Sequence, residues 1–147
     1  MLKILVVDDS LILRKNIKKY VATLGHNIVG EAKTGIEAVQ MARHLKPDLI
    51  TMDITMPDMD GISAVKKIRE FNTDVNIIMV TSHGQEEMVV DSLKSGAKGY
   101  ILKPVTEEKL AKSINTLYEE YAQTTPATVV ENDAIVDETL DDEFLDD

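Results

Sequence analysis

Five short apolar runs alternate with longer amphipathic stretches over the first 121 residues, and no other feature constrains the fold as strongly. The runs are β-branched or continuously apolar, as buried strands are, and cover residues 3–8, 27–32, 48–53, 75–80 and 99–103. Helical periodicity marks residues 10–24, 35–45, 61–71, 85–95 and 106–121. Five βα units in series predict a doubly wound, flavodoxin-like α/β fold, with helices on both faces of a five-stranded parallel sheet in the order 2-1-3-4-5.

The helix expected at 10–24 has a clear amphipathic pattern. We expect Ser10 to cap its start. Its apolar residues should face the sheet and its basic residues the solvent. The apolar set is Leu13, Ile17, Tyr20, Val21 and Leu24, and the basic set is Arg14, Lys15, Lys18 and Lys19. Thr106 should cap the last helix in the same way as Ser10 caps the first.

The charge of the chain is unevenly distributed. The net charge is -10, but residues 124–147 hold nine acids and no Lys or Arg, which leaves 17 acids against 16 bases in residues 1–123. No concentrated basic stripe is present, so we do not expect nucleic-acid binding. The chain has no cysteine, which excludes disulfides and thiolate metal sites. The first apolar run is too short for a signal peptide or a membrane span, and we expect a cytoplasmic, monomeric protein.

An acidic tail is expected at residues 122–147, after a single folded domain at 1–121. Its charge density and few aromatic residues predict disorder when it is alone. Val136, Leu140 and Phe144 are spaced by four and would form an apolar stripe on a helix. The tail is therefore either a solubilising extension or a segment that folds on contact with a partner.

Residues with related chemistry lie at the carboxyl ends of four of the five expected strands. In a doubly wound sheet, the carboxyl ends of the strands meet at the edge where ligands bind. Taken strand by strand, the residues are Asp8 and Asp9, then Asp53, then Thr81 and Ser82, and finally Lys103 before a proline.

Three acids brought this close would repel one another and raise the pKa of at least one of them. A divalent cation removes that penalty, and Mg²⁺ is suitable because it binds carboxylate oxygens and keeps positions for water and a phosphate oxygen. A Lys ammonium and a Thr hydroxyl can neutralise charge on a transferred group. The residues therefore predict Mg²⁺-dependent formation of an aspartyl phosphate.

This set, with MPDMDG after Asp53, resembles the receiver domains of two-component response regulators, especially the stand-alone CheY-like members that act in chemotaxis. The resemblance covers residues 2 to about 121 and implies a phosphoacceptor switch, not an enzyme. It implies that Asp53 accepts a phosphoryl group from a histidine kinase. It also implies that Asp9, Asp53 and the main-chain carbonyl of Thr55 bind Mg²⁺ directly, with Asp8 acting through a water.

The resemblance implies further roles. Lys103 would contact the phosphoryl group, and its bond to the following proline would be cis. Thr81 would hydrogen-bond the phosphoryl group, and Tyr100 would pack inward once Thr81 has moved. Ser82 is small, which should leave the phosphoryl group open to donors and phosphatases. Thr55 carries no charge or amide to orient an attacking water, so we expect slow to moderate self-dephosphorylation.

Other nearby residues are expected to have no chemical role. Asp58 and Asp60 lie between a proline and a glycine, where acids favour turns and helix starts, so they should shape the loop after Asp53. His83 is expected to be an exposed loop residue.

The output is expected to be protein binding through the fourth helix, fifth strand and fifth helix. Partners would be a histidine kinase and a target such as the flagellar motor switch or a phosphatase. One alternative is an intermediate or phosphate sink in a phosphorelay. Another is a degenerate receiver used as a protein-binding module, and the complete acidic set argues against it. A small Mg²⁺-dependent aspartyl phosphatase would carry a second acid two residues after its nucleophile, where this chain has Thr55.

Overall fold

The computed structural model describes residues 1–119. The predictions for the tail at 122–147 and for a boundary near residue 121 lie outside the described residues. By its internal contacts the chain divides into two units, Met1–Ser113 and a second that begins at Ile114. The first unit holds the sheet, four helices and the start of the fifth helix.

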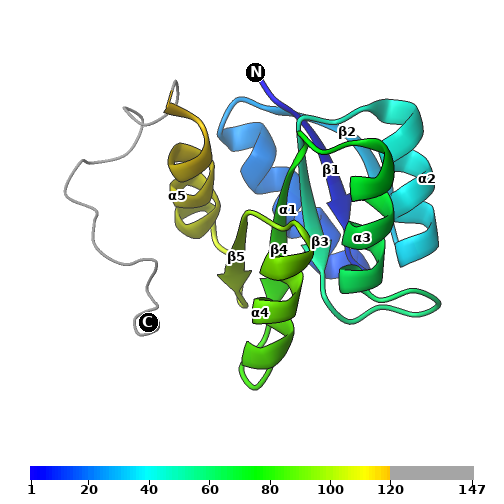
Figure 1. Ribbon diagram of the computed structural model, residues 1–147. Helices are drawn as coiled ribbons and strands as arrows, with labels where there is room; N and C mark the ends of the chain where they lie inside the picture. Colours follow the sequence, from blue (N-terminus) through cyan, green and yellow to red (C-terminus); the bar gives the residue numbers. More distant parts are fainter. Residues whose placement is uncertain (120–147) are drawn as a thin grey trace. The chain divides into compact units, whose positions relative to one another are not determined.

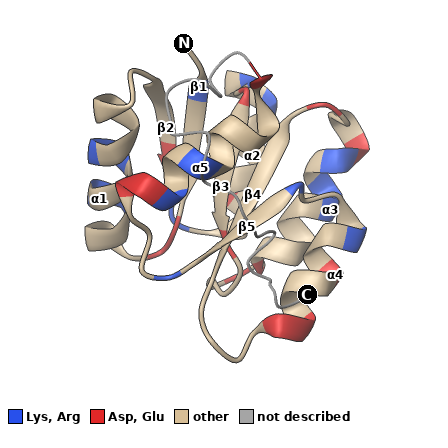
Figure 2. Cartoon of the chain, turned by 90° about the vertical axis from the view of Figure 1, so that its left-hand side faces the viewer, with Lys and Arg blue, Asp and Glu red and all other residues tan. Residues whose placement is uncertain are grey.

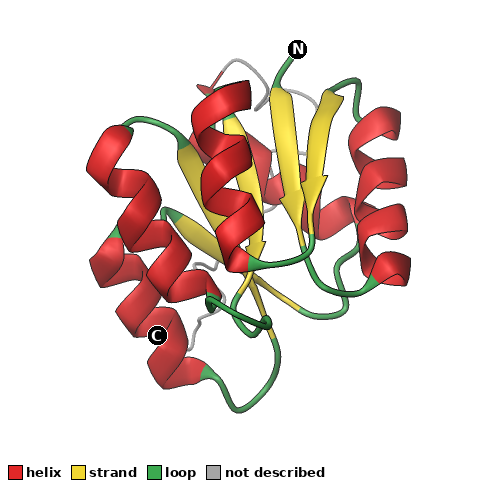
Figure 3. Cartoon of the chain, turned by 90° about the vertical axis from the view of Figure 1, so that its right-hand side faces the viewer, coloured by secondary structure: helices red, strands yellow, loops and turns green. Residues whose placement is uncertain are grey.

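The five expected strands form one parallel sheet in the order β2-β1-β3-β4-β5, which confirms the flavodoxin-like topology (Figures 1 and 3). Their bounds are β1 Lys3–Val7, β2 Asn27–Ala32, β3 Leu49–Asp53, β4 Asn76–Thr81 and β5 Gly99–Leu102. The sequence placed Thr81 directly after the fourth strand. In the structure it is the last residue of β4, because it still pairs with Leu102 of β5.

Five helices follow the strands, with bounds α1 Leu11–Thr23, α2 Gly35–Leu45, α3 Gly61–Phe71, α4 Glu86–Ser95 and α5 Glu107–Leu117. The prediction that α5 reaches residue 121 was wrong, because the helix ends at Leu117. Two consecutive acids, beginning at Glu119, follow this end. Negative charge is unfavourable at the carboxyl end of a helix, which favours an early stop.

Polar side chains cap several helices as expected. The hydroxyl of Ser10 accepts a hydrogen bond from the Leu13 amide at 3.2 Å. The hydroxyl of Thr106 accepts one from the amide three residues later at 3.1 Å. Helix α4 differs, because the residue at its N-cap is Gln85 and its side chain makes no capping hydrogen bond. That glutamine side chain is directed to other partners.

The sheet is covered on both faces within Met1–Ser113. Helices α2, α3 and α4 pack side by side on one face, and α1 lies on the other (Figures 1 and 3). Alternate strand residues point to each face, so Leu5 and Val7 join the core cluster beneath α2 and α3, while Ile4 and Val6 are buried on the opposite side. This double burial explains the continuously apolar strands.

The prediction that Arg14 faces solvent was wrong. The residue is only 6% exposed, although neighbouring Lys15 is exposed as expected. The guanidinium Nη1 donates to the main-chain carbonyl of Asp8 at 2.7 Å, and Nε donates to Glu31 at 3.0 Å. A charge can be buried where such partners replace its water, and these two are brought close only by the folded sheet.

The register of the strands determines which residues reach the carboxyl edge. Val7 pairs with Met52, so the loop after β1 begins beside Asp53. Asp53 pairs with Val80, so Thr81 lies one residue further along the neighbouring strand. The main-chain carbonyl of Thr81 then accepts a hydrogen bond from the amide of Lys103 at 2.7 Å. Four strands therefore deliver their terminal residues to one edge.

Helix α1 carries basic residues and no acids, whereas α3 carries charged residues of both signs (Figure 2). Among residues 1–119, no helix has the length and apolar character that crossing a membrane requires.

Glycine at position 61 is required by the loop that carries Asp53. The amide of Gly61 donates to the carbonyl of Ile54 at 2.8 Å, which turns the chain back against β3. A Cβ atom at this position would overlap the carbonyl oxygen of Asp53. The loop can close this tightly only because no side chain is present.

We predict that Gly61→Ala lowers the free energy of unfolding by about 1–3 kcal/mol, the usual cost of overpacking. Gly99→Ala is the matched control, because a Cβ there meets no atom within 4 Å. Denaturant unfolding would measure both variants. Equal stability of the two variants would contradict the tight closure at Gly61.

Candidate metal centre

Three carboxylates from two strand ends meet at the carboxyl edge of the sheet. Asp8 and Asp9 follow β1 and Asp53 ends β3, and one carboxylate oxygen of each lies within 4.8 Å of the others. Asp8 and Asp53 are buried, at 1% and 4% exposure, whereas Asp9 is exposed. The convergence expected from the sequence is therefore present, with one face of the cluster open to solvent.

One oxygen of this cluster lacks a protein partner. Asp8 Oδ1 accepts a hydrogen bond from the amide of Ser10 at 2.8 Å, but Asp8 Oδ2 is buried and has no hydrogen-bond partner within residues 1–119. A buried oxygen of this kind is costly unless something satisfies it. Oxygen ligands of two or three carboxylates beside open solvent fit Mg²⁺, which retains several waters.

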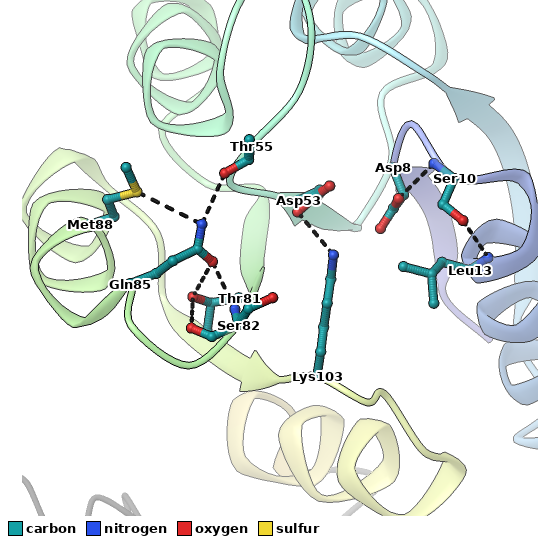
Figure 4. A network of polar contacts seen from close by, with 10 residues as sticks. All are labelled: Asp8, Ser10, Leu13, Asp53, Thr55, Thr81, Ser82, Gln85, Met88 and Lys103. Atoms are coloured by element: carbon teal, nitrogen blue, oxygen red, sulfur yellow. Dashed lines mark hydrogen bonds and ion pairs between the residues drawn. The ribbon is translucent and has the colours of Figure 1, made fainter.

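Asp53 has an unusual protonation equilibrium for an aspartate. Burial raises its pKa to about 6, and the neighbouring Asp8 carboxylate adds to this effect. Lys103 opposes it, because its ammonium Nζ lies 3.5 Å from Asp53 Oδ1 (Figure 4). Burial also raises the pKa of Asp8. In the metal-free protein, Lys103 therefore does not offset the rise in the pKa of Asp53 that burial and the neighbouring acids cause.

Arg14 contacts the main chain of the loop that carries Asp8 and Asp9. Its bond to the Asp8 carbonyl ties the first turn of α1 to the loop after β1. Glu31 on β2 accepts from both Arg14 and Lys18, the latter at 2.7 Å, and these bonds lower the pKa of Glu31. Arg14 thus fixes the main chain that presents the acids. The sequence reasoning missed this contact, since the residue resembles any other base on an amphipathic helix.

A glutamine missed by the sequence reasoning connects the ends of two neighbouring strands. The amide oxygen of Gln85 lies 3.0 Å from the hydroxyl of Thr81 and accepts from the amide of Ser82 at 2.7 Å. Its amide nitrogen donates to the hydroxyl of Thr55 at 2.9 Å (Figure 4). The only sequence signal is a glutamine where a helix normally starts with Ser, Thr, Asp or Asn.

The remaining candidates lie where the sequence placed them. The Lys103–Pro104 bond is cis, as the resemblance implied. Tyr100 is half-buried and packs against the core cluster, while Ser82 and His83 are exposed. The structure does not test the roles assigned to Tyr100 and Ser82, nor the metal contact of the Thr55 carbonyl, and they stay predictions.

The two other acids after Asp53 shape the loop. Asp60 caps α3 by accepting from the amide of Ser63 at 2.8 Å. Asp58 adopts the left-handed backbone conformation, with φ of 69°. Asp is among the residues that tolerate this conformation in turns.

We predict that Asp53→Asn stabilises the metal-free protein at pH 7 by about 1–3 kcal/mol. The pKa of Asp53 in the folded protein, about 6, lies above the ordinary 3.8, so the folded state binds this proton more tightly than the unfolded chain does. The ionised carboxylate therefore costs stability in full above about pH 6. The cost fades between pH 6 and 4 and disappears below, where both states are protonated.

Denaturant unfolding in the presence of a chelator, at pH 7 and pH 4, would measure this difference. Asp91→Asn on the exposed side of α4 is the control and should change stability little at either pH. An Asp53→Asn variant that is less stable than wild type at pH 7 would contradict the raised pKa.

The arrangement agrees with comparisons to known proteins. The sequence profile of the response regulator receiver domain matches residues 4–115. Chemotaxis protein CheY of Bacillus subtilis (strain 168) is 42% identical over 113 residues, which are 77% of this chain and 94% of that protein. Chemotaxis protein CheY of Thermotoga maritima is 40% identical over 113 residues, with the same shares covered.

Solved structures show the same similarity. A chain of the CheX-CheY-BeF3-Mg²⁺ complex of Borrelia burgdorferi matches with a TM-score of 0.73 and 35% identity, covering 78% of this chain and 87% of that one. The response regulator domain of Thermotoga maritima CheB matches with a TM-score of 0.68 and 36% identity, covering 90% and 99%. With the profile match across the sheet and CheY relatives at about 40% identity, this chain belongs to the response regulator receiver family.

Proposed function

We propose that this protein is a phosphorylation switch in which Asp53 accepts a phosphoryl group from the phosphohistidine of a histidine kinase. The observation that carries the proposal is the meeting of three carboxylates within 4.8 Å, with the Lys103 ammonium 3.5 Å from Asp53. A structural role alone would not account for this cluster, because burying two acids side by side costs stability.

In the proposed reaction, an oxygen of Asp53 forms a bond to phosphorus while the bond from phosphorus to the donor's imidazole nitrogen breaks. Lys103 neutralises charge on the transferred group from the side of β5. Thr81, at the end of β4, donates a hydrogen bond from its hydroxyl to a phosphoryl oxygen. These are the positioning and electrostatic contributions that phosphoryl transfer requires.

We further propose that Asp9, Asp53 and the main-chain carbonyl of Thr55 hold Mg²⁺, with Asp8 acting through a bound water. Mg²⁺ would supply the positive charge that offsets the crowded acids and developing phosphoryl charge. The buried Asp8 Oδ2, which lacks a partner among the described residues, supports this assignment. A relative at 35% identity was solved with BeF3 and Mg²⁺, which also supports it.

The output would be protein binding in chemotaxis, since CheY proteins are among the relatives. Phosphorylation replaces a carboxylate by a group of about -1.5 to -2 charge with three acceptor oxygens. If the resting protein samples its active form a few per cent of the time, about 3 kcal/mol of differential stabilisation makes that form dominant. Thr81 and Tyr100 would transmit the change to α4 and β5. The target would be a flagellar motor switch or a phosphatase, or the next protein of a phosphorelay.

We predict that incubation with acetyl phosphate and Mg²⁺ adds one phosphoryl group per chain, as measured by intact-protein mass spectrometry. Asp53→Asn should abolish the adduct, because the acceptor oxygen is replaced by an amide. Asp60→Asn is the matched control, because Asn can still cap α3 and the loop keeps its shape. Omitting Mg²⁺ should suppress the adduct in both wild type and control.

Two outcomes would contradict the proposal. An adduct that survives Asp53→Asn would place the acceptor elsewhere. Repeated turnover of simple phosphate esters would favour an aspartyl phosphatase, which the hydroxyl of Thr55 at the second-acid position disfavours.

A further inference from the structure

The residue before α4 breaks a local rule of helix formation. Helices prefer Ser, Thr, Asp or Asn at the N-cap, where a short polar side chain accepts from an amide of the first turn. Gln85 occupies this position and makes no capping bond. Its side chain instead reaches the ends of β3 and β4. Departures of this kind from local preference are expected at functional positions.

The orientation of the Gln85 amide follows from its partners. The main-chain amide of Ser82 can only donate, so the atom 2.7 Å away must be the carbonyl oxygen of Gln85. The hydroxyl of Thr81 lies 3.0 Å from that same oxygen, which has no proton to give. Thr81 must therefore donate, and Gln85 Oε1 is its nearer acceptor, because the Ser82 carbonyl oxygen, the other acceptor among the described residues, lies 3.4 Å from the hydroxyl.

From this competition we propose that Gln85 is a positioning residue that holds Thr81 in its resting orientation. The inference rests on the proposed function, in which Thr81 gives the same proton to a phosphoryl oxygen. One proton cannot serve both acceptors, so the active form must break the bond between Thr81 and Gln85. The strength of that bond sets part of the equilibrium between the resting and active forms.

The amide nitrogen of Gln85 also connects this side chain to the loop after β3. Gln85 Nε2 donates to the hydroxyl of Thr55, two residues after Asp53. Thr55, Thr81 and the start of α4 are thereby joined through one side chain (Figure 4). Release of Thr81 leaves Gln85 attached to Ser82 and Thr55, so the loop after β3 is retained while Thr81 turns.

The test uses the full chain with Gln85→Met, which keeps the length of the side chain and removes both hydrogen-bonding groups. A typical net hydrogen bond corresponds to about a 2- to 10-fold change in an equilibrium constant. We therefore expect Gln85→Met to bind beryllium fluoride with Mg²⁺ about 2- to 10-fold more tightly than wild type, as measured by calorimetry. Gln40→Met, the same change at an exposed position of α2, should bind as wild type does.

Two further variants separate this role from helix stability. Gln85→Ser can cap α4 but cannot reach Thr81, and it should also bind more tightly. Thr81→Val removes the hydroxyl and keeps the shape of the side chain. In the Thr81→Val background, Gln85→Met should leave the affinity unchanged. An equal gain in both backgrounds would overturn the proposed contact with Thr81.

A measurement without ligand keeps the inference separate from the proposed function. In wild type, NMR couplings of Thr81 should report one side-chain rotamer, and in Gln85→Met they should report averaging. An unchanged rotamer would overturn the role of Gln85, whether or not the protein accepts phosphate. The proposed function alone would be overturned if wild type bound no beryllium fluoride while the Thr81 couplings in Gln85→Met still showed averaging.

Discussion

Repulsion among carboxylates at one edge of the sheet is the constraint on which the other features of the site depend. Asp8 and Asp53 are nearly removed from water, and Asp9 lies beside them. Burial raises the pKa of both buried acids, a neighbouring aspartate adds to the effect on each, and the single nearby lysine does not cancel it. A site in this state gains stability from any positive charge that it can bind. That property connects the proposed metal binding, the proposed phosphoryl acceptance and the predicted stabilisation of the metal-free protein by Asp53→Asn.

Several otherwise ordinary features of the fold serve to keep the acids in place. The register brings the ends of four strands to one edge, and Gly61 lets the loop after Asp53 fold back against its carbonyl. Arg14 ties the main chain of Asp8 to α1 from within the protein. Each contact acts on the main chain and leaves the carboxylate oxygens available. The acids are therefore fixed in position without being neutralised.

The strands and the acid cluster could be predicted from the sequence because both depend on local pattern. Apolar runs of strand length define the sheet, and a parallel sheet brings its carboxyl ends together whatever the side chains are. Arg14 and Gln85 could not be placed in this way. Long flexible side chains choose partners that only the folded chain brings near, and periodicity assigned Arg14 to the wrong face. The end of α5 was also misplaced, because helix ends depend on weak local preferences.

The proposed switch depends on Asp53 being the group that accepts the phosphoryl group. Borohydride reduces an acyl phosphate to an alcohol, so it converts a phosphorylated aspartate into homoserine. Peptide mapping of the phosphorylated and reduced protein should find homoserine at position 53 and unmodified aspartate at positions 8, 9, 58 and 60. Homoserine at any of those four positions, or none at position 53, would contradict acceptance of the phosphoryl group by Asp53.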